Sequence, residues 1–279
     1  MSYPINYPTP QNANVQIFRG GDASTTAHIY TRDWVKPQGA SFVWFTLIGA
    51  GGGGSGCFVD SGAPQYYPGG GGASGNVTNF MCPAFLLPDI LQVTIGKGGA
   101  GSDVAVDVAP ANGSNGTSTQ IQYIQKNNSG YTLLAASGGS GAIGLTGYGT
   151  GGFSAGVDPI TPMTAAGFYN STAGQNGADG NQAIGTNGSI FVMGGNGYNY
   201  ASTVIASYYG YQASLKSGYS QLSPIPLSIP NVSTTDSGTG KSISQSFGCG
   251  GNGGGEIFTG GTASNGGRGG DGLAIIVTW

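Results

Sequence analysis

Side chains that could do chemistry are sparse in this chain of 279 residues, of which 7% are charged and one is a histidine. A Ser-His-Asp triad would need His28, which lies among threonines, and the sequence has no nucleophile elbow. Asp103 and Asp107 lie close together in DVAVDV, where a strand could place both carboxylates on one face. Such a pair could serve glycoside hydrolysis or calcium binding, but spacing alone is weak support and no EF-hand-like loop is present. We therefore expect no catalytic residue, no metal site and no enzymatic activity.

Two glycine runs resemble phosphate-binding motifs only superficially. Gly49–Gly54 follows an apolar stretch and fits the GxGxxG pattern, which any glycine run satisfies. A dinucleotide site also needs a following helix, and SGCFVDSGAPQYYP cannot form one. Gly96–Ser102 lacks the Gly-Lys-Ser/Thr end of a P-loop. We expect no bound cofactor.

The cysteines and charges narrow the class of protein further. Cys57, Cys82 and Cys249 form an odd set without CxxC spacing, which favours three buried thiols over one bridge and a free thiol. The formal net charge is −3 and no basic run is present, so we expect no nucleic-acid partner. The opening MSYPINYPTPQ lacks the features of a secretion signal, and no apolar stretch approaches the ~20 residues of a membrane span. We expect neither a secretion signal nor membrane insertion.

The elements that must position any site combine apolar strands with glycine blocks. Phe42–Ile48 is uncharged and rich in aromatic and β-branched residues, and it leads directly into Gly49–Gly54. The same unit recurs at Leu91–Gly101 and Ser189–Gly197, and its order is reversed where Gly266–Gly272 precedes LAIIVTW. With 57 glycines and 14 prolines, a flexible polymer is the alternative, but the clustered apolar runs argue against it.

The chain is predicted to form a single glycine-rich β domain over residues 15–279, preceded by an extended N-terminal arm over residues 1–14. Long excursions are expected at 157–187 and 198–247, and no helix is expected. A turn around Pro37-Gln38-Gly39 is predicted within Trp34–Ala40. The predicted strands are Val15–Phe18, His28–Thr31, Phe42–Ile48, Asn76–Cys82, Leu91–Ile95, Ile121–Ile124, Tyr131–Leu134 and Leu273–Trp279.

Glycine blocks can contribute to a packed structure if they adopt the polyproline II geometry. That conformation has no internal hydrogen bonds, and without Cβ atoms several such segments can approach closely and bond to one another. The predicted fold class is all-β, with an antiparallel β-sandwich-like core, packed polyglycine II-like segments and long loops. Coiled glycine loops are the alternative.

Two polar or aromatic stretches are candidates for binding. Tyrosine with Ser, Gly and Asn is typical of binding loops, although the tyrosines could instead pack on the glycine segments. The receptor-binding candidates are Tyr198, Tyr200, Tyr208, Tyr209, Tyr211 and Tyr219. The Pro-rich arm could dock on a partner or be a frayed terminus, and its docking candidates are Tyr3, Ile5 and Tyr7.

The order of these motifs resembles the glycine-rich domain of bacteriophage and other viral tail-fibre and virion proteins, including adhesins with polyglycine II layers. The resemblance rests on TRDWVKPQGA, FVWFTLIGAGGGG, VTIGKGGAG, GGNGGGEIF and the closing GGRGGDGLAIIVTW. It implies a virion protein with receptor-facing loops at 157–187 and 198–247. Tail-fibre adhesins often carry a large fibre-attachment domain, whereas here we expect only the arm of residues 1–14 ahead of the glycine-rich domain.

We therefore expect a non-enzymatic virion structural protein located at a tail, a fibre or the capsid surface. The favoured role is a host-receptor-binding adhesin, with avidity multiplying weak contacts to a host-surface glycan or protein. The alternative is a capsid-surface decoration or head-fibre subunit with an assembly role. Expected partners are other virion proteins, reached through the arm, and further copies of the chain, with a trimer favoured. An ice- or wall-binding protein is a third class, although no regular threonine lattice is present.

Overall fold

The computed structural model describes residues 13–19, 30–62, 65–124, 130–147, 149–154, 167–177, 179–180, 247–248, 250–251, 253, 256–257, 262–263 and 265–279. These residues form an all-β structure without an α-helix and with one 3₁₀ turn, η1 (Ala84–Leu86). The strands are β1 (Asn14–Arg19), β2 (Tyr30–Val35), β3 (Phe42–Ile48), β4 (Phe58–Asp60), β5 (Gln65–Tyr67), β6 (Val77–Pro83), β7 (Ile90–Ile95), β8 (Ala105–Val106), β9 (Thr119–Ile124), β10 (Gly130–Ala136), β11 (Phe168–Thr172), β12 (Glu256–Ile257), β13 (Thr262–Ala263) and β14 (Leu273–Thr278).

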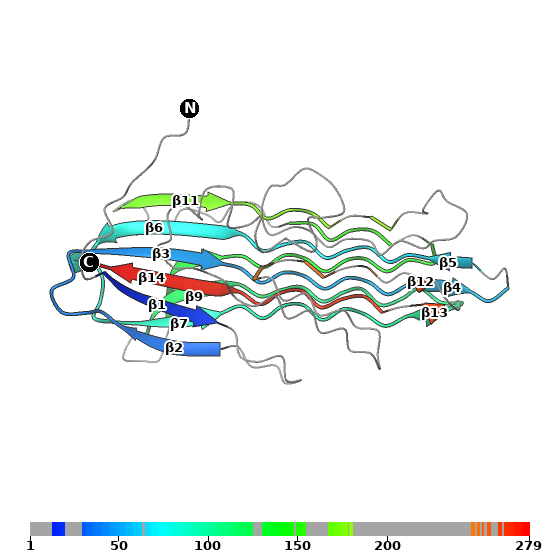
Figure 1. The fold of residues 1–279 in the computed structure, drawn as a ribbon, viewed down its shortest axis with the longest axis horizontal. Coiled ribbons are helices and arrows are strands. Elements are labelled where there is room, and N and C mark those ends of the chain that lie inside the picture. Colours follow the sequence, from blue (N-terminus) through cyan, green and yellow to red (C-terminus); the bar gives the residue numbers. More distant parts are fainter. Residues whose placement is uncertain are drawn as a thin grey trace, which may run out of the picture.

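Two antiparallel sheets pack against each other at one end of the molecule (Figure 1). The first has the strand order β1-β14-β3-β6-β11 and the second has the order β10-β9-β7-β2. Alternate residues of β3, namely Val43, Phe45 and Leu47, are buried, as expected for a strand with one face on the core. The antiparallel sandwich predicted from the sequence is therefore present.

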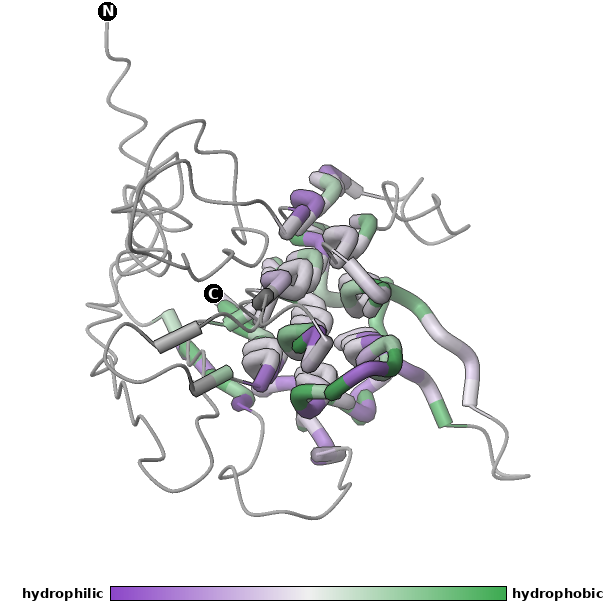
Figure 2. The backbone as a smooth tube through the Cα atoms, turned by 90° about the vertical axis from the view of Figure 1, so that its right-hand side faces the viewer, coloured by the Kyte–Doolittle hydropathy of each residue, from purple (hydrophilic) through white to green (hydrophobic). Residues whose placement is uncertain are grey.

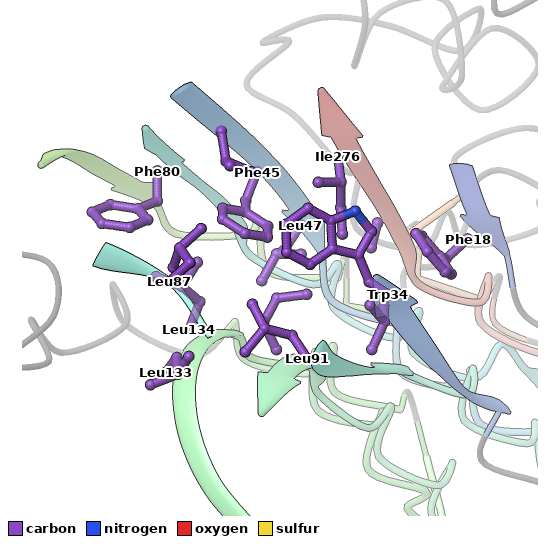
Figure 3. Close-up of a cluster of buried hydrophobic side chains, with 14 of the residues drawn as sticks. Phe18, Trp34, Phe45, Leu47, Phe80, Leu87, Leu91, Leu133, Leu134 and Ile276 are labelled. Carbon is purple, nitrogen blue, oxygen red and sulfur yellow. The ribbon is translucent and has the colours of Figure 1, made fainter. Parts of the chain in front are cut away.

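The core of this sandwich lies between the two sheets (Figure 3). Phe45 of β3 meets the fully buried Trp34 of β2 edge to face, with ring centroids 5.9 Å apart. Strand β2 continues to Val35, past the end at Thr31 predicted from the sequence, so the predicted strand was too short at this end. The turn predicted around Pro37-Gln38-Gly39 is confirmed. The turn follows at Gln38–Gly39, where Gly39 has a φ of 80° that favours glycine.

Beyond the sandwich, nine glycine-rich segments of the described chain lie side by side along the long axis of the molecule. Figure 1 shows them as wavy lines continuing the strands, and Figure 2 shows them end on as neighbouring coils. We call this array the glycine bundle. Its segments are 49–57, 68–76, 96–104, 110–118, 137–143, 149–154, 173–180, 248–253 and 265–272, of which residues 178, 249 and 252 are outside the described residues.

Segment 49–57 occupies the centre of the glycine bundle. Its amides donate in rotation to three neighbours: residues 49, 52 and 55 bond to segment 68–76, residues 50 and 53 to 110–118, and residues 51 and 54 to 265–272. Its carbonyls accept in rotation from three others: residues 50 and 53 from 137–143, residues 51 and 54 from 96–104, and residue 52 from 248–253. The three-residue period is that of the polyproline II helix, and the six neighbours form a hexagon around the centre. The packed polyglycine II segments predicted from the sequence are therefore present.

Close approach of backbones explains why the central segment needs glycine. A Cβ atom added to Gly53 would lie 2.0 Å from the carbonyl oxygen of Ala100, and one added to Gly52 would lie 2.1 Å from that of Ser140. These neighbours are backbone atoms that are themselves held by the bundle, so they cannot move aside cheaply. Glycine is required here by space and not by an unusual backbone angle.

The expected excursion at 157–187 is partly built into the scaffold. Phe168–Thr172 forms β11 and pairs with β6, so this part of the chain is a strand and not a loop. The following residues join the bundle, where the amides of Gly177 and Gly180 donate to the carbonyls of Gly152 and Gly149. The expected excursion at 198–247 lies outside the described residues except for Phe247.

Candidate functional site

The glycine bundle separates two ends of the molecule that carry exposed apolar side chains. At ~3.1 Å per residue, the eight residues from Gly49 to Gly56 span about 25 Å. The sandwich end contains the chain's C-terminus, and the opposite end, which we call the distal end, contains β4, β5, β12 and β13 (Figure 1). Strand β8 also belongs to the distal end because it pairs with β4.

The distal end exposes apolar side chains from two adjoining stretches of chain. Val106 and Val108 are 53% and 61% exposed, and Ile143 and Leu145 are 38% and 43% exposed. The two stretches meet at Gly144, where an added Cβ would lie 2.1 Å from the carbonyl oxygen of Pro110. Together these four residues form the distal apolar set.

Acidic groups accompany the distal apolar set. Asp107 has a φ of 58°, and its carboxylate accepts hydrogen bonds from the hydroxyl and the amide of Ser61, at 2.5 and 2.8 Å. The hydroxyl bond first, and the amide bond second, lower the pKa of Asp107, so this exposed carboxyl is ionised near neutral pH. Asp60 accepts a bond from the amide of Gly62 in the same turn. The described part of this end therefore presents apolar side chains beside anionic groups.

The sandwich end carries a second apolar set, formed by Val35, Phe42, Phe85, Leu86 and Ile90, which are 40–82% exposed. Val35 and Ile90 are partners in the β2–β7 register, and Phe42 stacks on Trp279 at a centroid distance of 6.1 Å. The Lys36 ammonium holds the turn that contains η1. It donates to the carbonyls of Ala84 and Leu87 and pairs with Asp89 at 2.9 Å. We call these five exposed residues the basal apolar set.

Polar side chains close the outer grooves of the glycine bundle. Carbonyl or carboxylate oxygens of six Asn and Asp residues accept hydrogen bonds from amides of an adjacent segment, at 2.7–3.0 Å. These residues are Asn112, Asn115, Asn176, Asp179, Asn265 and Asp271. They recur at intervals of three or six residues within a segment, and each precedes a glycine. This triplet pattern is visible in the sequence, and our sequence analysis did not use it.

Most of the candidate binding residues named from the sequence lie outside the part of the chain that the structure describes. The six tyrosines from Tyr198 to Tyr219 lie outside the described residues, as do His28, Cys249 and the arm candidates Tyr3, Ile5 and Tyr7. The suggestion that one strand carries both Asp103 and Asp107 was wrong, because β8 contains only Ala105–Val106 and Asp107 adopts a left-handed backbone.

The GxGxxG stretch Gly49–Gly54 cannot serve as a phosphate loop, since its amides are bonded to neighbouring segments of the bundle. No group of three metal-ligating His, Cys, Asp or Glu side chains occurs within the described ranges. Likewise, no helix in the part of the chain that the structure describes is long and apolar enough to cross a membrane.

Two of the three cysteines are buried thiols, as predicted. Cys57 lies at the end of the central bundle segment and Cys82 lies on β6 in the sandwich core. Burial raises the pKa of the Cys82 thiol to about 11, so the thiolate that would act as a nucleophile or metal ligand is disfavoured. Cys82 is therefore a packing residue.

These features define an elongated all-β protein in which a β-sandwich is extended by a hexagonal polyglycine II bundle. Residues 25–279 match the family model described as a glycine-rich domain, and the chain belongs to that family. The comparison with curated proteins gave no match.

Proposed function

We propose that the protein is a non-enzymatic structural protein of a virion, and that its favoured role is adhesion to the host surface. The observation that carries this proposal is the separation of two exposed apolar sets by a hydrogen-bonded bundle about 25 Å long. A bundle with this many backbone bonds is rigid enough to hold one end away from the body that anchors the other. The resemblance of the glycine pattern to tail-fibre and virion proteins supports the virion assignment.

In this proposal the sandwich end attaches to the particle. Asn14, the last residue of the expected arm of residues 1–14, lies in β1 and pairs with Thr278, so the described chain begins at this end, near Phe42 of the basal apolar set. Exposed apolar groups on a fixed turn suit a permanent interface, in which a desolvated apolar centre supplies most of the binding energy. Tyr3, Ile5 and Tyr7 remain the docking candidates of the arm, with other virion proteins as partners and a homotrimer as the favoured assembly.

The distal end then contacts a glycan or protein of the host surface. The distal apolar set provides contact area, while Asp60 and Asp107 disfavour strongly anionic surfaces. Gly180, where the described chain stops ahead of the tyrosine-rich segment, lies near this end, because its amide bonds to Gly149 and Gly149 bonds to Pro68. The tyrosines from Tyr198 to Tyr219 remain proposed receptor-binding residues.

The second candidate is a capsid-surface decoration or head-fibre subunit with an assembly role. The basal apolar set favours it, since an interface with the particle is all that this role requires. The two candidates differ in whether the distal end has a ligand.

The test combines location with two matched variants. Gold-labelled antibody shows where the protein lies on purified particles, and fluorescent protein reports binding to host cells. We expect label at a tail or fibre tip, and we expect Val108→Ser with Leu145→Ser to reduce cell binding roughly tenfold, about the loss of two apolar contacts. Val35→Ser with Ile90→Ser, at comparable exposure on the other end, should leave cell binding unchanged. Label over the whole shell would overturn the adhesin role in favour of decoration, and unlabelled particles would remove the virion assignment.

A further inference from the structure

Four asparagines that close the outer grooves of the glycine bundle are each followed by glycine, and the two residues of each pair make different bonds. The asparagine carbonyl accepts an amide of an adjacent segment, as Asn115 does from Gly141 at 2.9 Å. The glycine that follows donates its own amide to another backbone carbonyl, as Gly116 does to Gly139 at 2.9 Å. The four pairs are Asn112-Gly113, Asn115-Gly116, Asn176-Gly177 and Asn265-Gly266.

An Asn–Gly pair can deamidate spontaneously when the chain is free to move. The glycine nitrogen attacks the side-chain carbonyl carbon of asparagine, forming a C–N bond, while the bond from that carbon to the side-chain nitrogen breaks. Ammonia leaves with the proton of the glycine nitrogen, and a five-membered imide remains. Water then opens the imide at one of its two carbonyls, giving aspartate or isoaspartate, without oxidation or reduction. Glycine favours this step because it has no side chain to hinder the approach.

The bundle opposes both requirements of this attack. The glycine nitrogen must turn toward the asparagine side chain, but its amide proton is committed to a carbonyl 2.8–2.9 Å away in all four pairs. The side-chain carbonyl must turn toward that nitrogen, but it accepts a bond from an adjacent segment at 2.8–3.0 Å. Breaking these bonds requires local opening of the bundle.

We propose that the closed bundle suppresses deamidation at these four Asn–Gly pairs, and that they become modification sites wherever the bundle opens. This protection depends on the bundle alone, whether the protein is an adhesin or a decoration subunit. A copy of the protein whose bundle has opened would then be modified covalently at these asparagines, without an enzyme.

The two products of deamidation affect the bundle differently. Aspartate is tolerated as a groove-closing residue, since Asp179 and Asp271 already accept the amides of Gly151 and Gly98 at 2.7 and 2.8 Å. Isoaspartate instead routes the main chain through the side-chain carbon and lengthens it by one atom. A longer residue breaks the three-residue period by which the segments bond to their neighbours, so an opened segment that forms isoaspartate cannot close again in register.

The folded full chain and a peptide of residues 110–118 are each incubated at mildly alkaline pH. Mass spectrometry then measures the extent of deamidation at each asparagine. We expect Asn112 and Asn115 to react at least about tenfold more slowly in the protein than in the peptide, a factor that corresponds to about 1.4 kcal/mol. A smaller ratio at both sites overturns the proposal.

A variant pair separates protection by the bundle from simple burial. Gly53→Ala places a Cβ against the Ala100 carbonyl and leaves all four Asn–Gly pairs unchanged, whereas Gly147→Ala has nothing within 4 Å of the added atom. We expect faster deamidation in Gly53→Ala and the wild-type rate in Gly147→Ala. If hydrogen exchange shows an opened bundle in Gly53→Ala and the asparagines still react at the wild-type rate, the proposal is wrong.

Discussion

At the scale of single residues, burial decides what the few reactive side chains can do. Cys82 could act as a nucleophile in another setting, but it lies in the sandwich core and its thiolate has lost the solvation that would stabilise it. Asp107 shows the opposite case, because it stays at the surface and two hydrogen bonds from Ser61 stabilise its charge. The environment of each side chain therefore makes the Cys82 thiol part of the packed core and the Asp107 carboxylate part of the charged surface of the distal end.

The thiol of Cys82 should make the protein less stable at high pH. Its pKa is about 11 in the folded chain against 9.0 ordinarily, so between these values the unfolded chain has lost the proton that the folded chain keeps. The contribution of the protonated thiol to the free energy of unfolding is therefore fully present below pH 9. It is lost as the pH rises toward 11, by about 2–3 kcal/mol in total. Urea unfolding at both pH values measures the change.

The control for this prediction is Cys82→Ala, which lacks the titrating group but keeps every lysine and tyrosine. We expect its stability to fall by about 2–3 kcal/mol less than that of the wild type over the same pH interval. Equal losses in the two proteins would show that the thiol does not control the alkaline dependence.

At the scale of elements, the central bundle segment depends on glycine wherever a neighbouring backbone approaches. Gly53 donates to Ser114 and accepts from Ala142, and the carbonyl of Ala100 fills the space of its missing side chain. A methyl group at this position must displace segment 96–104, or else shift Gly53 away from its hydrogen-bond partners in segments 110–118 and 137–143. The segment can therefore be ordered despite the high entropy that glycine loses on folding, because each residue gains bonds to several neighbours.

Replacement of Gly53 by alanine should lower the free energy of unfolding, whereas the same replacement at an open site should not. We expect Gly53→Ala to lower the free energy of unfolding by roughly 3 kcal/mol, the upper range for a substitution that overfills a packed site. Gly147→Ala should be neutral or stabilise by up to about 1 kcal/mol, because the site is open and alanine restricts the unfolded chain. Denaturant titration of both variants makes the comparison, and similar losses would contradict the packing described for the central segment.

At the scale of the whole molecule, the sandwich and the glycine bundle are parts of one structure. The strands β3, β7 and β10 run directly into bundle segments, and other segments run back into β6, β9 and β14. Thr119 reinforces the junction, since its hydroxyl donates to the Ile48 carbonyl and accepts from the Gly96 amide, at 2.7 and 3.1 Å. Neither part can unfold without disturbing the ends of the other.

This continuity predicts a single unfolding transition. The chain has three tryptophans, all in the sandwich, so their fluorescence reports on that part alone, whereas polyproline II circular dichroism reports on the bundle. We expect the two signals to change at the same temperature, as in a two-state transition. Gly53→Ala should lower both midpoints together. A bundle signal lost well before the tryptophan signal would contradict this.

The sequence by itself determined the class of fold and most of its strands. Phe42–Ile48 was predicted with its observed bounds because an uncharged run of aromatic and β-branched residues before a glycine block allows few other structures. The buried thiols and the packed glycine segments followed from composition and from the geometry open to glycine.

Only the tertiary structure decided which segments meet. Gly53 contacts residues 100, 114 and 142, and such distant pairings leave no trace in the residues beside it. For the same reason the strand that contains Trp34 was predicted to end at Thr31, and Phe168–Thr172 was assigned to a loop. Trp34 packs against Phe45 of the other sheet, and Phe168–Thr172 pairs with β6, and both partners are distant in the sequence. Local sequence fixes what a segment can form, whereas the side chains and amides it faces depend on neighbours brought together only when the whole chain packs.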